Sequence, residues 1–372
     1  MNITIIGDIM LGRFVQEKYH TQKYGLVSDE VLSEIRQSDY VIANLESPVT
    51  DRDSTNSLAF AGSEDMLSQL EWVDCLSLAN NHINDFGETG MVDTIANLEK
   101  HAIKHNGLFE NRYVPHIVEK DGCNIAVVMC TDMLNYEFDE CCKYQVLRAD
   151  ALEVNETIQK CASDGYFTIL FAHCGSLFSR FPNPEIRNLL HSAIDAGVGC
   201  VVTAHSHCLG GEWQYKGVPI FWSLGDFLMD GGSYRRRKAC FLTLNIESNK
   251  LKSWKITPTV TNMELQVAFP TAKVKRKMLK SYQGVSRKIG VQHKDYAAFY
   301  KRQYKKEMLQ HSLSTLHFLY DTKGLLGFMK MLKVRYYAVY RMIHRMIFDR
   351  SKSRYDTDGI DQKHLLNIDD IR

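Results

Sequence analysis

The chain has 372 residues, of which 45% are hydrophobic and 24% are charged. This composition is typical of a soluble globular protein, and the length allows one large domain with an appendage or two domains. No apolar run approaches the roughly 18–20 residues that span a bilayer, and strand-like residues begin at Asn2, so we expect neither a transmembrane helix nor a signal peptide. The ten cysteines form no Cys-x-x-Cys pair, which predicts reduced thiols, no structural zinc finger and a cytoplasmic location.

Strand-like and helical patterns alternate up to about residue 260. The predicted strands are residues 2–6, 40–43, 75–79, 124–129, 167–172, 199–203, 218–222, 239–246 and 251–258. The predicted helices are residues 28–37, 63–71, 87–101, 149–163 and 184–196. This alternation indicates a layered α/β domain, and the closing run of strands predicts antiparallel additions at one edge. We therefore expect an α/β domain over residues 1–262 and a basic, mainly helical region over residues 263–372.

Charge is strongly separated along the chain, although the net charge is only +1. Residues 1–270 contain 22 Lys and Arg against 35 Asp and Glu, a net charge of −13. Residues 271–350 contain 19 against 4, a net charge of +15. A basic block joined to an acidic body indicates contact with something anionic, such as a membrane or a nucleic acid.

One basic segment has the periodicity of an amphipathic helix. It begins at Leu325 and ends at Arg350, and its apolar seam repeats at alternating spacings of four and three residues with basic side chains largely opposite. Such a helix suits a surface of anionic lipid. Alternatively, the seam packs on the body or on a second copy of the chain. A nucleic-acid partner is the less favoured interpretation, because phosphates attract any Lys-rich surface.

Five polar clusters follow directly after predicted strands. They are Gly7-Asp8, Asn44-Leu45-Glu46, Asn80-Asn81-His82, His173-Cys174-Gly175 and His205-Ser206-His207. Open α/β sheets build their sites at the carboxyl ends of strands, so we expect these side chains to converge. Carboxylate, amide and imidazole ligands suit pairs of Mn, Fe or Zn ions, which can promote displacement at phosphorus or attack on an amide. Taken singly, each cluster is also explained as a helix cap, a turn or an ordinary histidine.

Six ordered motifs resemble a known family. They are Gly7-Asp8-Ile-Met-Leu-Gly12, Asn44-Leu-Glu-Ser-Pro48, Ala79-Asn-Asn-His-Ile-Asn-Asp-Phe-Gly87, His173-Cys-Gly175, Ala204-His-Ser-His207 and Tyr215…Trp222-Ser-Leu-Gly-Asp-Phe227. Over residues 2–260 the chain resembles the CapA-type capsule or poly-γ-glutamate synthesis proteins, a branch of the calcineurin-like metallophosphoesterase superfamily. The resemblance implies a four-layer α/β/β/α sandwich with two divalent metal ions between the sheets, followed here by a basic helical C-terminal extension.

The resemblance also implies roles for individual residues. The six metal ligands would be Asp8, Glu46, Asn81, His173, His205 and His207. The first and last of these would hold one ion, Glu46 would bridge, and the other three would complete the second site. His82 would donate a proton to the leaving group or bind the oxyanion, and Asp85 would orient its ring.

Several positions depart from the pattern of the superfamily. Met10 stands where many metallophosphoesterases have His, so we expect the first metal to be weakly held. Cys174, Ala204 and Asp226 replace an aromatic residue, a Gly and an Asn. These changes leave the proposed ligands in place and indicate altered substrate contacts.

Four further residues are candidates for substrate binding. Asn44 and Asn80 lie within the motifs, and Arg235 and Arg236 belong to a basic run that follows Asp226. The arginines could bind a phosphate group or a polyanion through charge-assisted hydrogen bonds. Alternatively, they form a solvated hairpin tip.

Together these features predict a metal-dependent hydrolase or transferase, acting on a phosphoester or an amide, in the synthesis of a bacterial capsule, poly-γ-glutamate or envelope polymer. One alternative is a non-catalytic assembly protein whose metal centre stabilises the fold or binds polymer. Another is a small-molecule phosphatase. The predicted partners are an anionic polymer or phosphorylated substrate and an anionic membrane surface, which would place the protein at the inner face of the membrane.

Overall fold

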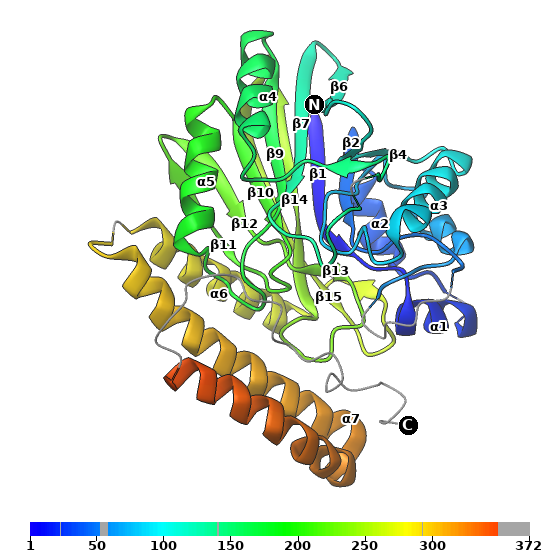
Figure 1. The fold of residues 1–372 in the computed structure, drawn as a ribbon, viewed down its shortest axis with the longest axis vertical. Helices are drawn as coiled ribbons and strands as arrows, with labels where there is room; N and C mark the ends of the chain where they lie inside the picture. The colour runs from blue at the N-terminus through cyan, green and yellow to red at the C-terminus, as the bar shows by residue number, and fades with distance from the viewer. Residues whose placement is uncertain (23, 53–58, 140, 292, 349–372) are drawn as a thin grey trace.

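The computed structural model describes residues 1–348 apart from residues 23, 53–58, 140 and 292, with side chains to Thr322. Two β-sheets lie face to face at its centre (Figure 1). The first sheet has the order β16-β15-β14-β1-β2-β3-β4, with β13 also paired to β1, and the second has the order β11-β12-β10-β9-β7-β6.

The bounds of the elements are as follows. The strands of the first sheet are β1 Asn2–Ile9, β2 Tyr40–Leu45, β3 Cys75–Ser77, β4 Lys104–Asn106, β13 Asp226–Leu228, β14 Lys238–Glu247, β15 Lys250–Thr261 and β16 Val267–Ala268. Those of the second are β6 His116–Lys120, β7 Cys123–Thr131, β9 Phe167–His173, β10 Cys200–Ala204, β11 Gly211–Tyr215 and β12 Val218–Trp222, and a separate pair is β5 Leu108–Phe109 and β8 Gln145–Val146. The helices are α1 Arg13–Thr21, α2 Asp29–Ile35, the 3₁₀ helix η1 Glu64–Leu70, α3 Gly87–Lys100, α4 Leu152–Ser163, α5 Pro184–Asp195, α6 Ala272–Gly290 and α7 Tyr296–Phe348.

Three hydrophobic cores separate four layers. One core lies between the two sheets, a second joins the first sheet to α1, α2 and α3, and a third joins the second sheet to α4, α5 and α6. Strand β9 shows how the sequence builds them: Ile169 and Phe171 belong to the core between the sheets, and Leu170 belongs to the core under the helices. Because successive side chains of a strand point to opposite faces, a strand that is buried on both sides is apolar at every position. The predicted α/β/β/α sandwich is therefore confirmed.

The predicted strands all occur, with ends that differ by a few residues. Residues 63–71 were predicted as a helix and form the 3₁₀ helix η1 instead. Helix α1 was not predicted, since Val15 is its one buried side chain and its apolar pattern is correspondingly weak. Strands β4, β11 and β13 were missed because they are short or carry polar residues.

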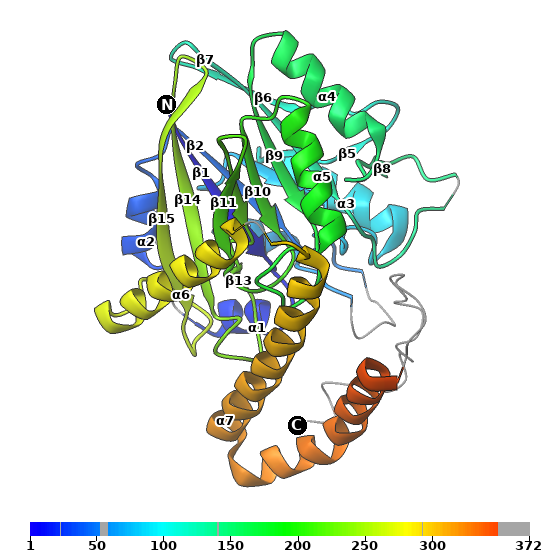
Figure 2. The same ribbon diagram turned by 90° about the vertical axis from the view of Figure 1, so that its left-hand side faces the viewer.

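The C-terminal helices pack on the body. Helix α6 buries Met278, Tyr282, Val285 and Ile289, and the last two belong to the core beneath the second sheet. Strand β16 extends the first sheet beyond residue 262. Helix α7 breaks at Gly324, whose φ of 66° is left-handed, and the chain changes direction there (Figure 2).

The segment from Leu325 to Phe348 is helical, as predicted, but its side chains and Arg350 lie outside the described residues. None of the helices in the described part of the chain combines the length and the apolar character that crossing a bilayer requires.

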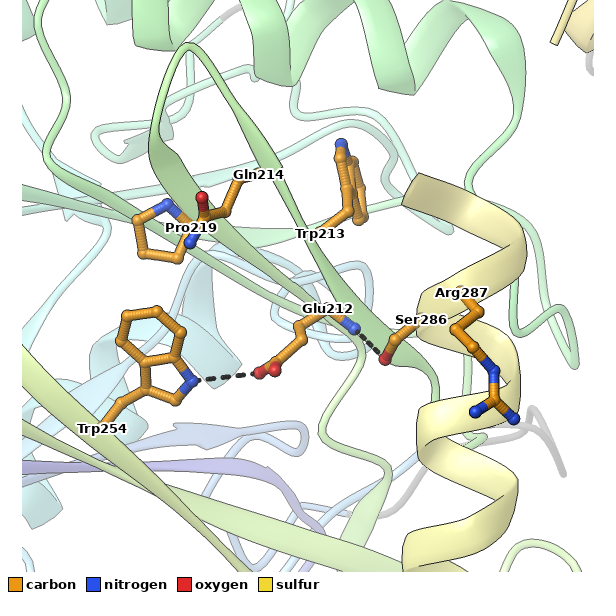
Figure 3. A pocket seen from close by; sticks show the side chains of 7 residues that line it. All are labelled: Glu212, Trp213, Gln214, Pro219, Trp254, Ser286 and Arg287. Atoms are coloured by element: carbon orange, nitrogen blue, oxygen red, sulfur yellow. Dashed lines mark hydrogen bonds between the residues drawn. The ribbon is translucent and has the colours of Figure 1, made fainter. Parts of the chain in front are cut away.

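A hollow of about 280 Å³ marks the seam between α6 and the sheets (Figure 3). It is lined by Glu212, Trp213, Gln214, Pro219, Trp254, Ser286 and Arg287. The Glu212 carboxylate accepts hydrogen bonds from the Trp254 indole of β15 and the Tyr282 hydroxyl of α6, both at 3.1 Å. Glu212 therefore ties α6 to both sheets, and the hollow contains none of the predicted site residues.

Candidate metal centre

The predicted ligands gather where the carboxyl ends of four parallel strands meet. Asp8 lies in β1 opposite Asn44 of β2, and Glu46 follows two residues later. In the other sheet His173 ends β9 opposite Ala204 of β10. His205 and His207 then follow β10 on the same edge of that sheet. Because the two sheets face each other, these side chains enclose one buried space.

Two overlapping triads could each hold a metal ion. One consists of Asp8, Glu46 and His207, and the other of Glu46, His173 and His205. Within each triad, one ligand atom from every residue lies within 4.8 Å of the others. Glu46 belongs to both triads, which is the position that the resemblance implies for a bridging ligand.

Glu46 is the strongest indication of a cation. Its side chain is 0% exposed, and in the part of the chain that the structure describes neither carboxylate oxygen has a hydrogen-bond partner. Burial, together with the charges of Asp8 and Asp226, raises its pKa well above the usual range. A buried carboxylate without partners is strongly unfavourable unless a cation neutralises it. The mixed oxygen and imidazole set therefore fits a divalent metal of the Mn, Fe or Zn type.

Asp8 differs from Glu46 although both are fully buried. One Asp8 oxygen accepts a hydrogen bond from the Asn44 amide at 2.8 Å, and the other accepts one from the backbone N–H of His205 at 3.1 Å. Burial by itself would raise the pKa of Asp8, but the contact with His173 and the charges of His173 and His207 lower it. The direction of this shift favours the ionised form of the Asp8 carboxylate.

The surroundings of His173 and His205 favour the protonation state that a metal ligand needs. Burial lowers the pKa of both His173 and His205, which favours the neutral imidazole. His173 Nε2 lies 2.7 Å from Asn81 Oδ1 and 3.0 Å from His205 Nδ1, which places Asn81 beside the second triad. His205 and His207 have φ values of 92° and 54°. Such left-handed backbone is strained for a non-glycine residue and is concentrated at functional sites.

Asn44 and Asn80 are buried beside the proposed ligands and form hydrogen bonds around them. The Asn44 amide contacts His173 Nδ1 at 3.2 Å as well as Asp8, and the Asn80 amide donates to the backbone oxygen of Leu45 at 2.7 Å. Both side chains are at most 1% exposed. The structure therefore gives them the surroundings of positioning residues, whereas the sequence indicated substrate contacts.

His82 lies beside the second triad in the predicted arrangement with Asp85. His82 Nδ1 is 2.7 Å from Asp85 Oδ2, and the backbone N–H of Asp85 donates to the His82 carbonyl. The Phe60 ring stacks on His82 with 3.9 Å between ring centroids. Asn135 links the pair to the metal residues, because its amide lies 3.1 Å from His82 Nδ1 and its oxygen accepts from Asn81 at 2.8 Å. The contact with Asp85 is made through Nδ1 and not through the other ring nitrogen, Nε2.

Asp226 and Asn135 contact the proposed site residues but were not predicted as part of the site. His207 Nδ1 lies 2.7 Å from Asp226 Oδ1, and the second oxygen of Asp226 accepts from Arg236 at 3.1 Å. Asp226 lies four residues after the predicted strand 218–222, so its place near the end of a strand could have identified it as a site residue. Asn135 lies in the loop after β7, where no sequence pattern identifies it.

The two arginines are not a solvated hairpin tip. Arg236 is bound to Asp226, and its side chain is 19% exposed. Arg235 pairs with Glu307 of α7 and also donates to the Glu307 backbone oxygen at 3.0 Å. Both guanidinium groups are thus engaged within the protein, and Arg236 is one contact away from His207.

The sequence matches the family model described as bacterial capsule synthesis protein PGA_cap over residues 2–231. It is 27% identical to the PGA biosynthesis protein CapA of Bacillus subtilis (strain 168) over 291 residues, which cover 75% of each chain. It is also 27% identical to the capsule biosynthesis protein CapA of Bacillus anthracis over 265 residues, which cover 67% of this chain and 64% of that relative.

Among solved structures, the sulfate thiohydrolase SoxB of Thermus thermophilus is similar at 12% identity and a TM-score of 0.42, covering 77% of this chain and 61% of that one. The assignment to a family rests on the sequence matches, which include all six proposed ligands. The chain belongs to the PGA_cap family of bacterial capsule synthesis proteins.

Proposed function

We propose that this protein is a metal-dependent hydrolase or transferase that acts on a phosphoester or an amide during the synthesis of a capsule, poly-γ-glutamate or envelope polymer. The observation that supports this most strongly is Glu46, a fully buried carboxylate that is shared by two ligand triads and whose two oxygens have no hydrogen-bond partner among the described residues. The membership of the family supports the biological process.

The residues around the triads have complementary tasks in this proposal. A pair of bound ions would polarise the substrate and stabilise the charge that develops on its oxygens. His82 lies at the edge of the centre and donates a proton from Nε2 to the leaving group, while Asp85 and Phe60 hold its ring in one orientation. Asn135 contacts both Asn81 and His82, and so fixes the position of the pair His82 and Asp85 relative to Asn81.

The first experiment measures bound metal and hydrolysis of an aryl phosphodiester with Mn²⁺ for the wild type and for Asp8→Ala. Wild-type turnover and its loss in Asp8→Ala are expected, whereas the control Asp195→Ala, which removes an exposed carboxylate of α5, should behave like the wild type. His82→Ala should lower turnover by about 10²–10⁴-fold, the usual contribution of a general acid, without loss of metal. Unchanged turnover in His82→Ala would contradict the role given to this residue.

A non-catalytic metal centre is the second candidate. The ligands of both triads are at most 6% exposed, and closed coordination is typical of structural sites, since catalytic sites keep an open position. In this case the protein would assemble or hold the polymer machinery and the ions would stabilise the fold. Metal-loaded protein that hydrolyses neither phosphoesters nor amides, but melts at a lower temperature after chelation, would favour this candidate.

We also propose that the protein is cytoplasmic and docks on the anionic inner face of the membrane through its C-terminal helices. Within the described residues, a group of basic side chains on α6, on α7 and at Lys294 between them is exposed and forms no ion pair. They are Lys273, Lys275, Arg276, Lys277, Lys280, Arg287, Lys288, Lys294, Lys301, Arg302, Lys305 and Lys306. Each basic residue near an anionic bilayer contributes about 1 kcal/mol of attraction.

Flotation with vesicles that contain or lack phosphatidylglycerol tests this docking. Binding to the anionic vesicles alone is expected, and the triple variant K301E, R302E and K305E should weaken it. A matched reversal on the acidic body, K100E, K120E and K160E, should leave it intact. Equal binding to both kinds of vesicle, or binding to nucleic acid alone, would contradict the proposal.

A further inference from the structure

Helix α7 lies outside the segment that matches the family model, which ends at residue 231, yet it contacts the loops that carry the metal centre. The link begins at Glu307, whose side chain is 2% exposed. Arg180, in the loop after β9, forms two hydrogen bonds with its carboxylate at 2.9 and 3.0 Å. Arg235, in the loop between β13 and β14, pairs with the same carboxylate. One side chain of α7 therefore joins two loops that come from different sheets.

This junction is ionised. Burial by itself would raise the pKa of Glu307, but the hydrogen bonds and charges of Arg180 and Arg235 lower it. Bidentate arginine–carboxylate pairs fix geometry as well as energy, because two parallel hydrogen bonds must both be satisfied. Loss of the carboxylate would leave two partly buried guanidinium groups without their counter-charge, so the loops would have to rearrange.

A second contact is made one turn further along α7. The His311 ring stacks on Phe178, with 3.8 Å between ring centroids and 5° between ring planes. Phe178 has a left-handed φ of 60°, and its backbone N–H donates to the carbonyl of Ser206 at 2.8 Å. Ser206 separates the two histidine ligands His205 and His207. Helix α7 thus packs, through Phe178, against the turn after β10 on the side of His207, whose ring is the one that Phe178 approaches.

The two contacts converge on the first triad. The Arg236 guanidinium lies 5.8 Å from the centre of the Phe178 ring and donates to Asp226, which in turn contacts His207 Nδ1 at 2.7 Å. A hydrogen bond from a carboxylate to the remote nitrogen of a ligating histidine fixes the ring and raises its basicity. The Phe178 ring itself lies 6.2 Å from that of His207.

We propose that Glu307 and His311 of α7 are positioning residues for the metal site of Asp8, Glu46 and His207. Glu307 acts through Arg235, the residue that precedes Arg236 in the chain, and His311 acts through Phe178, which lies beside Arg236; both paths continue from Arg236 to Asp226. The inference rests on the metal binding that is part of the proposed function. The second triad has its supports in the N-terminal half of the chain, where Asn44 and Asn81 contact His173. Loss of the α7 contacts should therefore affect one site and spare the other.

The test is a calorimetric titration of metal-free, full-length protein with Mn²⁺, combined with the melting temperature of the metal-free form. We expect Glu307→Gln and His311→Ala to weaken one of two binding steps by about 10–100-fold, the usual effect of losing a group that supports a ligand. The other step should keep its wild-type affinity. The matched control is Glu212→Gln, because Glu212 also anchors a C-terminal helix, through a part-buried hydrogen bond from Tyr282, but within the described part of the chain it contacts none of the metal residues. It should lower the melting temperature and leave both affinities unchanged.

Wild-type affinities in both Glu307→Gln and His311→Ala would overturn the inference, as would equal weakening of both steps in Glu307→Gln and Glu212→Gln. If Glu307→Gln does not fold, His311→Ala provides the same comparison, since it removes a stacked ring and no buried charge. The readout is metal affinity, so a wild type that binds Mn²⁺ but hydrolyses nothing would contradict the proposed function and leave this inference standing.

Discussion

The two halves of the candidate metal centre share Glu46 but are supported in different ways. The half that contains His173 and His205 is surrounded by neutral amides, with Asn81 and Asn44 in contact with His173. The half that contains Asp8 and His207 depends on a charged partner, because Asp226 holds the His207 ring.

The supports also come from different parts of the chain. Asn44 and Asn81 belong to motifs of the N-terminal half, whereas Asp226 is linked through Arg236 to contacts made by α7. A carboxylate partner increases the basicity of a ligating histidine more than an amide does. This difference offers compensation for Met10, which stands where many metallophosphoesterases have His, and it predicts that the two halves respond separately to substitution.

The largest effect is expected for Glu46→Gln, because both halves lose their shared ligand. Both ions should be lost, and hydrolysis of an aryl phosphodiester should fall by at least about 10³-fold, the consequence of losing several kcal/mol of charge stabilisation. Metal analysis of the purified variant measures the first effect. Retention of one ion would show that Glu46 does not bridge. His207→Ala, which belongs to one triad, is the matched variant and should retain one ion.

Asp226→Ala tests the charged half alone. Its loss removes the partner of His207 and leaves Arg236 without a counter-charge, so one Mn²⁺ affinity should fall by about 10–100-fold while the other is kept. Calorimetric titration separates the two steps. Equal losses at both steps would mean that the halves are not independent.

Asn44→Ala tests the link between the halves. The Asn44 amide contacts both Asp8 and His173, so both affinities should decline, each by about 10-fold, the lower end of the range for such supports. The same titration measures this change. A decline at a single step would assign Asn44 to one half.

The smallest effect concerns Asp132, which lies beside the amide-supported half and accepts a hydrogen bond from the backbone of Gly175 at 2.9 Å. Burial raises the pKa of Asp132 to about 7, whereas the unfolded chain has a value of about 3.9. Between these values the folded protein binds more protons than the unfolded chain, so the free energy of unfolding falls as the pH rises from about 4 to 7. Asp132→Asn should remove this loss and be more stable than the wild type at pH 8 by about 1–2 kcal/mol.

Denaturant unfolding of metal-free protein at pH 4.5 and at pH 8 measures the difference. The advantage of Asp132→Asn should be present at pH 8 and absent at pH 4.5. An equal advantage at both values would contradict ionisation of Asp132 as the cause.

Much of the centre could be predicted because its ligands follow strands that are apolar on both faces. The run from Phe167 to Ala172 can be buried only in a sheet covered on both sides, and a histidine at its end must then lie at the edge where sites form. The same reasoning applies to Asp8 and to the pair His205 and His207. Helices α3 and α5 were equally clear, because their apolar positions repeat at helical spacing.

Sequence reasoning failed where a role depends on contacts between distant segments. Arg235 and Arg236 are adjacent and chemically alike, but one pairs with Glu307 and the other with Asp226. No spacing distinguishes them, because the direction of each side chain follows from the path of the loop between β13 and β14. Asn135 was missed for the same reason.

The sequence alone determined the layers and the candidate ligands, since hydrophobic periodicity and the residues at strand ends are local properties of the chain. Only the tertiary structure decided that Glu46 is shared by two triads and that, among the described residues, its oxygens have no hydrogen-bond partner. It also decided that a helix beyond the family match contacts loops that surround the centre. Both facts arise from packing two sheets and a helix together, and the free energy of that packing depends on pairs of residues that are far apart along the chain.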